Sequence, residues 1–89
     1  MRTRSRFRFA LGMLALLLEV AKRDPRVMKD PEPESLFIGF GESALEFQLR
    51  VWTEEPRWMR LRSDLGVAIQ DAMRKAQIAA PGLTGRVGP

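Results

Sequence analysis

The feature that most constrains the fold is a strict alternation of apolar and other residues between positions 44 and 52. Successive side chains of a β-strand point to opposite faces, so this alternation predicts a half-buried strand. One face is expected to pack on a core, and the other to lie in water or in an interface. The apolar positions are Leu45, Phe47, Leu49 and Val51.

A second strand is predicted immediately before this one, from Leu36 to Phe40. Gly41-Glu42-Ser43 separates the two, and a glycine adopts a positive φ at little cost. We therefore expect an antiparallel hairpin with Gly41 and Ser43 in its turn. The segment Asp30-Pro31-Glu32-Pro33 precedes the hairpin, and its prolines favour an extended connector.

Helical patterns flank the hairpin on both sides. Residues 9–23 are rich in Leu, Ala and Met, which favour helices, and Asp24-Pro25 ends the segment. A second helix is predicted from about Leu61 or Ser63 to Gln77, with Ser63 as its N-cap. The first helix has an expected apolar stripe of Leu11, Leu14, Leu18 and Ala21, widened by Met13, Leu17 and Val20. The second has Leu61, Leu65, Ile69, Ala72, Met73 and Ala76.

The predicted order of elements is helix, strand, strand, helix, which is an α+β arrangement with one antiparallel hairpin. Two strands form a marginal sheet even when helices cover one face. The sequence therefore predicts that a further strand or a neighbouring copy of the chain supplies additional cover. The expected core residues are Leu36, Ile38, Leu45, Phe47, Leu49, Val51, Leu65, Ile69 and Met73.

The formal charge of +4 is concentrated at the start of the chain. Residues 1–8 contain four arginines and no acid, and the remaining 11 of the 15 basic residues balance 11 acidic ones. Nucleic-acid-binding domains usually carry their basic residues on a folded face, so we expect no nucleic-acid partner. We divide the chain into a basic, solvated arm (1–8), a folded domain (9–78) and a flexible tail (79–89).

The first twenty residues also have features of a secretory signal peptide, because the uncharged run from Phe9 to Leu18 follows the arginines. This run is shorter than the roughly 20 apolar residues that span a bilayer. Two alternatives to the leading hypothesis stay open. One is a small secreted or membrane-surface protein with a signal-like N-terminus, and the other is a nucleic-acid-binding module that uses the basic arm.

Residues typical of catalytic and metal sites are scarce in this sequence. The chain has no His and no Cys, which removes the commonest general base and the usual zinc ligands. The acidic pairs Glu32/Glu34 and Glu54/Glu55 fall in predicted loops without convergent partners. We predict that the protein is not an enzyme, and that it uses no cofactor, no metal and no small-molecule substrate.

Several motifs spread over residues 14–78 occur together in a characteristic order. They are Leu16-Leu17-Leu18-Glu19-Val20-Ala21, Pro25-Arg26-Val27, Lys29-Asp30-Pro31-Glu32-Pro33, Phe37, Phe40-Gly41-Glu42-Ser43-Ala44-Leu45, Phe47, Leu49-Arg50-Val51-Trp52, Arg62-Ser63-Asp64-Leu65 and Ala68-Ile69. This series resembles the cytoplasmic C-terminal region of small-conductance mechanosensitive channels, the MscS-type family. The match of several motifs together is more specific than any one of them.

The resemblance implies a ferredoxin-like, two-layer domain at the cytoplasmic face of the cell membrane. It also implies self-association, with seven copies forming a vestibule below a pore that releases ions and small solutes during osmotic stress. The family's transmembrane helices, middle β domain and preceding strand do not occur in this sequence. Its last-strand motif is altered at residues 77–83. The chain is therefore expected to be a truncated, cytoplasmic vestibule fragment that does not conduct alone.

Arg50 and Trp52 are the candidate residues for contact between subunits. Both lie on the wetter face of the second predicted strand, where an aromatic side chain indicates an interface or a cation–π contact. The alternative is that Trp52 lies under a helix or loop of its own chain. The rest of the channel is the other partner that the resemblance implies.

Overall fold

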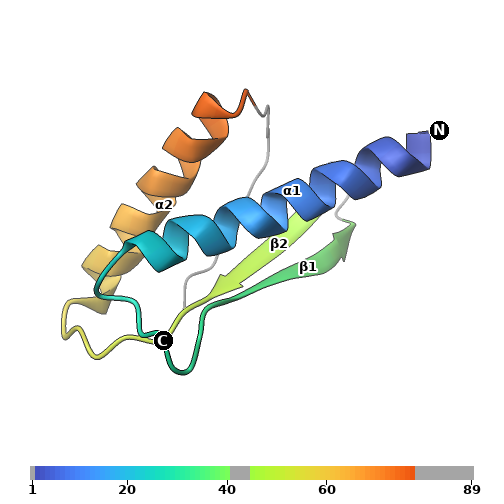
Figure 1. Ribbon diagram of the computed structural model, residues 1–89. Coiled ribbons are helices and arrows are strands. Elements are labelled where there is room, and N and C mark those ends of the chain that lie inside the picture. Colours follow the sequence, from blue (N-terminus) through green and yellow to red (C-terminus); the bar gives the residue numbers. More distant parts are fainter. Residues whose placement is uncertain (1, 41–44, 78–89) are drawn as a thin grey trace.

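The computed structural model describes residues 2–40 and 45–77, which form two helices and two strands (Figure 1). The elements are α1 (Arg2–Arg23), β1 (Glu34–Phe40), β2 (Leu45–Arg50) and α2 (Trp58–Lys75). Their order confirms the predicted helix-strand-strand-helix arrangement, and the fold is α+β. The predicted turn residues Gly41 and Ser43 lie outside the described residues.

β1 and β2 pair antiparallel, with Glu34 opposite Arg50 and Phe37 opposite Phe47. The register shifts between Phe37 and Gly39, so Ile38 is the extra residue of a β-bulge. Gly39 adopts a φ of 154°, a conformation that L side chains rarely take, and glycine is a common residue at such bulges. The bulge therefore interrupts β1 at the end nearest the predicted turn.

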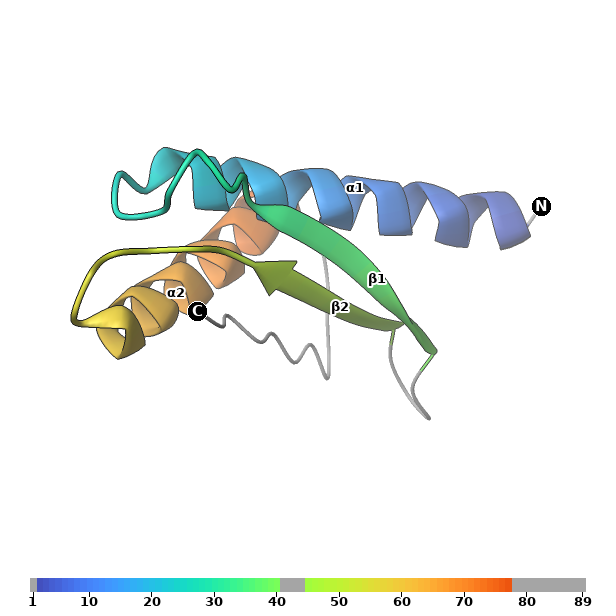
Figure 2. The same cartoon turned by 90° about the horizontal axis from the view of Figure 1, so that it is seen from below.

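The two helices lie on one side of the hairpin, where α1 packs on both strands and on α2 (Figures 1 and 2). Side chains from α1, β2 and α2 meet between these layers and form the core. Apolar burial of this kind is the main favourable term in folding. The buried residues are Met13, Leu17, Val20, Ala21, Val27, Phe47, Leu49, Val51, Leu61, Leu65, Ile69 and Met73.

The predictions for the core hold for β2 and α2 but fail in β1. Leu45 is partly buried and packs on the core, whereas Leu36 is half-buried and Ile38 is 54% exposed. Residues paired across an antiparallel sheet share a face, and Ser35 is paired with the buried Leu49. Ser35 therefore faces the helices, and the neighbouring Leu36 faces the opposite side. The prediction that Ile38 is buried is wrong.

The first helix begins at Arg2, seven residues before its predicted start. Arginine is itself a good helix former, so the helix continues back through the predicted arm. Its buried side is formed by Met13, Leu17 and Val20, while Leu11 of the predicted central stripe is 50% exposed. The predicted stripe and the observed one have the same helical spacing. Packing of α1 against α2 and the sheet buries the side that carries Met13. The division at residue 8 stays a prediction.

The second helix begins at Trp58, so the prediction of Ser63 as its N-cap is wrong. The backbone N–H groups of Arg60 and Leu61 donate to the carbonyl of Arg57 at 3.0 and 3.2 Å, which places the helix start there. Ser63 therefore lies inside the helix. Neither α1 nor α2 is long and apolar enough, over its described residues, to cross a membrane.

Candidate functional site

The side of the hairpin that faces away from the helices carries the predicted interface residues. We call this surface the outer sheet face. Ile38 and Glu46 of this surface are exposed, whereas Leu36 and Gln48 are half-buried. The outer sheet face consists of Glu34, Leu36, Ile38, Glu46, Gln48 and Arg50, with Trp52 just beyond the end of β2.

Arg50 and Trp52 lie close together at one end of this surface. The guanidinium carbon of Arg50 is 5.9 Å from the centroid of the Trp52 ring, which is cation–π distance. Arg50 Nη1 also lies 3.8 Å from Glu34 Oε1 across the hairpin. The structure thus brings the two predicted residues together in a cation–π contact, and their role in contact between subunits stays a prediction.

Trp52 is half-buried, and its burial comes from its own chain. Its carbonyl accepts a hydrogen bond of 2.7 Å from the backbone N–H of Met28, in the connection between α1 and β1. Trp52 is therefore held through its backbone carbonyl and through the contact of its ring with Arg50. Such a fixed, partly exposed aromatic residue is suited to protein contact, because it loses little conformational freedom on binding.

The backbone of the hairpin offers a second kind of contact. Within the described residues the sheet contains only β1 and β2, so each strand has one edge that pairs with no other described strand. Open edges present unpaired N–H and C=O groups to any additional strand. The outer sheet face and the open edges together form a surface suited to association with another polypeptide.

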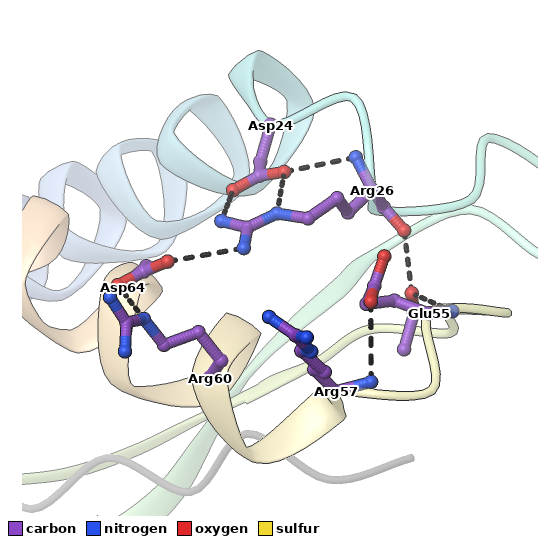
Figure 3. Close-up of polar contacts among 7 residues, drawn as sticks. Asp24, Arg26, Glu55, Arg57, Arg60 and Asp64 are labelled. Atoms are coloured by element: carbon purple, nitrogen blue, oxygen red, sulfur yellow. Dashed lines mark hydrogen bonds and ion pairs between the residues drawn. The ribbon is translucent and has the colours of Figure 1, made fainter.

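A separate cluster of charged residues joins α1, the loop after it and α2 (Figure 3). We call it the Arg26 junction; it consists of Asp24, Arg26 and Asp64. Arg26 Nε and Nη2 donate to the two carboxylate oxygens of Asp24 at 2.9 and 2.6 Å. Arg26 Nη1 donates to Asp64 Oδ2 at 3.1 Å, and this bond spans from the loop to α2. The fork geometry of arginine suits such paired recognition of carboxylates.

Hydrogen bonds extend the junction to the loop that follows β2. Thr53 Oγ1 donates to the carbonyl of Arg26 at 2.7 Å and accepts from the backbone N–H of Glu55 at 3.0 Å. Glu55 Oε1 in turn accepts from the backbone N–H of Arg57 at 3.2 Å, just before α2 (Figure 3). One arginine therefore connects the end of α1, the end of the hairpin and the start of α2.

The hydrogen bonds of Arg26 shift the pKa of Asp24 and of Arg26 itself. They lower the pKa of Asp24 below its usual value, and the opposing effect of burial is smaller. The two aspartates raise the pKa of Arg26 further above its already high value. Asp24 and Arg26 are thus both charged at neutral pH, and the cluster acts as a structural clamp. The sequence does not predict the pairing of Arg26 with Asp64, because a contact over 38 residues leaves no local signal.

Other surface features carry little chemistry of their own. A hollow of about 780 Å³ lies beside the loop between α1 and β1, lined partly by Lys22, Lys29 and Glu32. Among the described residues, no polar or charged side chain is fully buried, and no three acidic residues converge as metal ligands. Asp24 also lines this hollow, and its carboxylate already pairs with Arg26.

The comparisons with known proteins identify one family. The model described as "Mechanosensitive ion channel MscS, C-terminal" matches residues 11–80. An uncharacterised MscS family protein of Haemophilus influenzae is 42% identical over 40 residues, and mechanosensitive channel MscK of Escherichia coli is 45% identical over 42 residues. These alignments cover 45% and 47% of this chain.

The same alignments cover 4% of the length of each relative, so this chain corresponds to a small part of those proteins. No solved structure matches the chain significantly. The matched residues 11–80 include most of α1, the hairpin and all of α2. The outer sheet face and the Arg26 junction both lie within them.

Proposed function

Because this chain belongs to the MscS family of mechanosensitive ion channels, through the C-terminal domain of that family, we propose that it is a self-associating, non-enzymatic vestibule domain. Its contribution is contact between subunits, at the cytoplasmic face of the cell membrane. In the intact channel the domain serves the osmotic release of ions and small solutes. The pore belongs to membrane-spanning segments of the channel, and the resemblance implies seven copies around it.

The observation that carries this proposal is the incomplete cover of the hairpin. The helices cover one face, while the outer sheet face keeps Ile38 54% exposed and Leu36 half-buried. An apolar side chain beside open strand edges is a typical site of association. A second copy that packs on this surface would remove both from water.

Arg50 and Trp52 give this contact its polar part. Arginine and tryptophan are enriched in protein interfaces, where they often contribute much of the binding energy. The cation–π contact holds the pair in one arrangement before any partner arrives. We therefore assign Arg50 and Trp52 to the rim of the contact and Ile38 to its centre.

The solution mass of the full chain, measured by light scattering over a wide concentration range, tests the proposal. We expect one discrete oligomer for the natural sequence and a folded monomer for Ile38→Glu, which places a charge in the contact. The matched control is Met59→Glu on α2, because Met59 is 68% exposed and lies outside the outer sheet face. This control should assemble like the natural sequence.

Two results would overturn the proposal. One is a natural chain that stays a folded monomer at every concentration. The other is an oligomer that Met59→Glu disrupts as strongly as Ile38→Glu does. Circular dichroism of each variant establishes that the comparison is made between folded chains.

A further inference from the structure

The charge of α1 is segregated toward one end of the helix. Its first turns contain Arg2, Arg4, Arg6 and Arg8, and the first acidic residue of the chain is Glu19. This end of α1 extends past the hairpin in both views (Figures 1 and 2). The four arginine positions therefore belong to the projecting part of α1, and they precede every acidic position of the helix.

An exposed apolar stripe continues from this basic end along α1. Leu11 is 50% exposed, Ala15 is exposed, and Leu18 is half-buried. These positions are four and three residues apart, which places them on one helix face. Lys22, four residues further on, is also exposed. The stripe is thus apolar in the middle and basic at its C-terminal end.

Positions 4 and 8 precede Leu11 by seven and three residues, and these spacings belong to the same helix face. The series therefore reads basic, apolar and basic along one side of α1. A helix with this pattern lies in the headgroup layer of a membrane, where apolar residues enter the acyl boundary and cations contact anionic lipids. We infer that α1 binds anionic membrane surfaces through this side.

A membrane surface fits this pattern better than a nucleic acid does. Nucleic-acid sites combine cations with aromatic or hydrogen-bonding side chains on a folded face. Along the exposed side of α1 the groups between the basic positions are aliphatic at Leu11, Ala15 and Leu18, and Glu19 at the edge of this side is paired with Arg23. Aliphatic side chains gain from contact with acyl chains, and they add little to contact with a phosphate backbone.

This inference goes beyond the proposed function and depends on a different surface. α1 lies on the side of the sheet opposite the outer sheet face (Figure 2). A membrane contact through α1 therefore leaves Ile38 and Arg50 accessible to a second copy. The two contacts are separable by substitution, and Ile38→Glu is expected to leave the lipid binding of each single chain unchanged.

The test is binding of the full chain to vesicles at low salt. One set contains equal parts of phosphatidylglycerol and phosphatidylcholine, and the other contains phosphatidylcholine alone. We expect binding to the anionic vesicles only. Replacing the arginines at positions 2, 4, 6 and 8 with glutamine should weaken binding to the anionic vesicles by roughly 100-fold or more, because each cation near an anionic surface adds to the free energy of binding.

The matched control replaces Arg57, Arg60, Arg62 and Arg74 of the α2 region with glutamine. Both variants lower the formal charge from +4 to 0, since each loses four positive charges. The control should keep most of the affinity. Leu11→Ser should weaken binding by about threefold to tenfold, because it removes an apolar side chain from the membrane-facing stripe.

Three results would overturn the inference. The first is no preference for anionic vesicles. The second is an equal loss of affinity in the two glutamine variants, which would indicate a response to net charge alone. The third is tighter binding to an RNA or DNA oligonucleotide than to the vesicles, with Leu11→Ser unchanged in both assays. That result would indicate that the basic end of α1 binds nucleic acid instead of a membrane.

Discussion

The two faces of the hairpin differ in their cover. On the helix side, Phe47 and Leu49 keep 5% and 2% of their surface exposed. The Phe47 ring makes edge contacts with the rings of Phe9 and Phe37, with ring centroids 6.3 and 5.5 Å apart. On the outer sheet face, Ile38 keeps 54% exposed. The helix side contributes to the stability of the single chain, whereas the outer side keeps apolar surface available.

The sequence of β1 explains why this difference matters. Leu36-Phe37-Ile38 is apolar at successive positions, so both faces of the strand carry apolar side chains. Strands of this kind are usually covered on both sides, as in sheets with helices on each face. β2 alternates instead and places Glu46, Gln48 and Arg50 outward. The outer sheet face is therefore apolar along β1 at Leu36 and Ile38, with Glu34 at one end, and polar along β2.

The largest effect is expected from substitutions that compare the two faces directly. Phe47→Ala should lower the free energy of unfolding by about 3–4 kcal/mol, since it removes a buried aromatic ring and leaves a cavity. Ile38→Ala should lower it by less than about 1 kcal/mol, because the side chain is already half in water. Urea denaturation at low protein concentration measures both. Similar losses for the two variants would show that the faces do not differ in a single chain.

Lowering the pH tests how much the Arg26 junction contributes to the stability of the helix side. The pKa of Asp24 is lowered in the folded chain, so its ionised form stabilises the fold above the unfolded pKa of 3.8. This stabilisation is lost as the pH falls below about 4 toward the folded pKa. Asp24→Asn should therefore be less stable than the natural chain at neutral pH, by less than Phe47→Ala.

The two chains should become closer in stability as the pH falls to about 3. Thermal unfolding followed over this range measures the difference at each pH. A constant difference between Asp24→Asn and the natural chain would mean that the ionisation of Asp24 does not contribute to the stability of the helix side.

A smaller effect is expected where β1 meets α1. Ser35 Oγ donates to the carbonyl of Leu14 at 2.9 Å, so a polar group of the hairpin binds the helix on the covered side. Ser35→Ala should lower the free energy of unfolding by about 1 kcal/mol, the usual contribution of one such bond. Ser35→Thr, which keeps the hydroxyl, is the control in the same urea titration. Equal stability of the alanine variant and the natural chain would exclude a contribution from this bond.

The smallest effect on the single chain is expected on the outer sheet face. Arg50→Ala should lower the free energy of unfolding by only about 0.5 kcal/mol, because exposed cation–π contacts and exposed ion pairs contribute little. The same variant should weaken assembly measurably, and light scattering compares the two. A loss of stability as large as that of Phe47→Ala would make Arg50 part of the folded core instead.

The sequence alone predicts much of this fold, and its errors have physical causes. The alternation in residues 44–52 predicts which side chains of β2 are buried, because a period of two distinguishes the faces. β1 lacks that distinction, since Ser35 takes an inward position and apolar residues take both faces. The burial of Ile38 was therefore mispredicted, and only the pairing with β2 corrects it.

The two parts of the candidate site also differ in how far the sequence predicts their contacts. Arg50 ends β2 and Trp52 follows two residues later, so their common face and their contact follow from local periodicity. The Arg26 junction joins a loop to a helix 38 residues away, and hydrophobic patterns carry no information on such polar pairs. From the sequence, Asp24 is identified only at the end of the first helix, and Arg26 and Asp64 only within the motifs that resemble the MscS family.

Hydrogen–deuterium exchange of the full chain, at low and at high protein concentration, tests the central claim most directly. The account predicts that amides of residues 34–40 and 45–52 gain protection at high concentration, because a second copy covers the outer sheet face and its edges. Amides of residues 58–75 should exchange equally at both concentrations. Protection that appears in α2 and not in the hairpin, or in neither, would contradict the account.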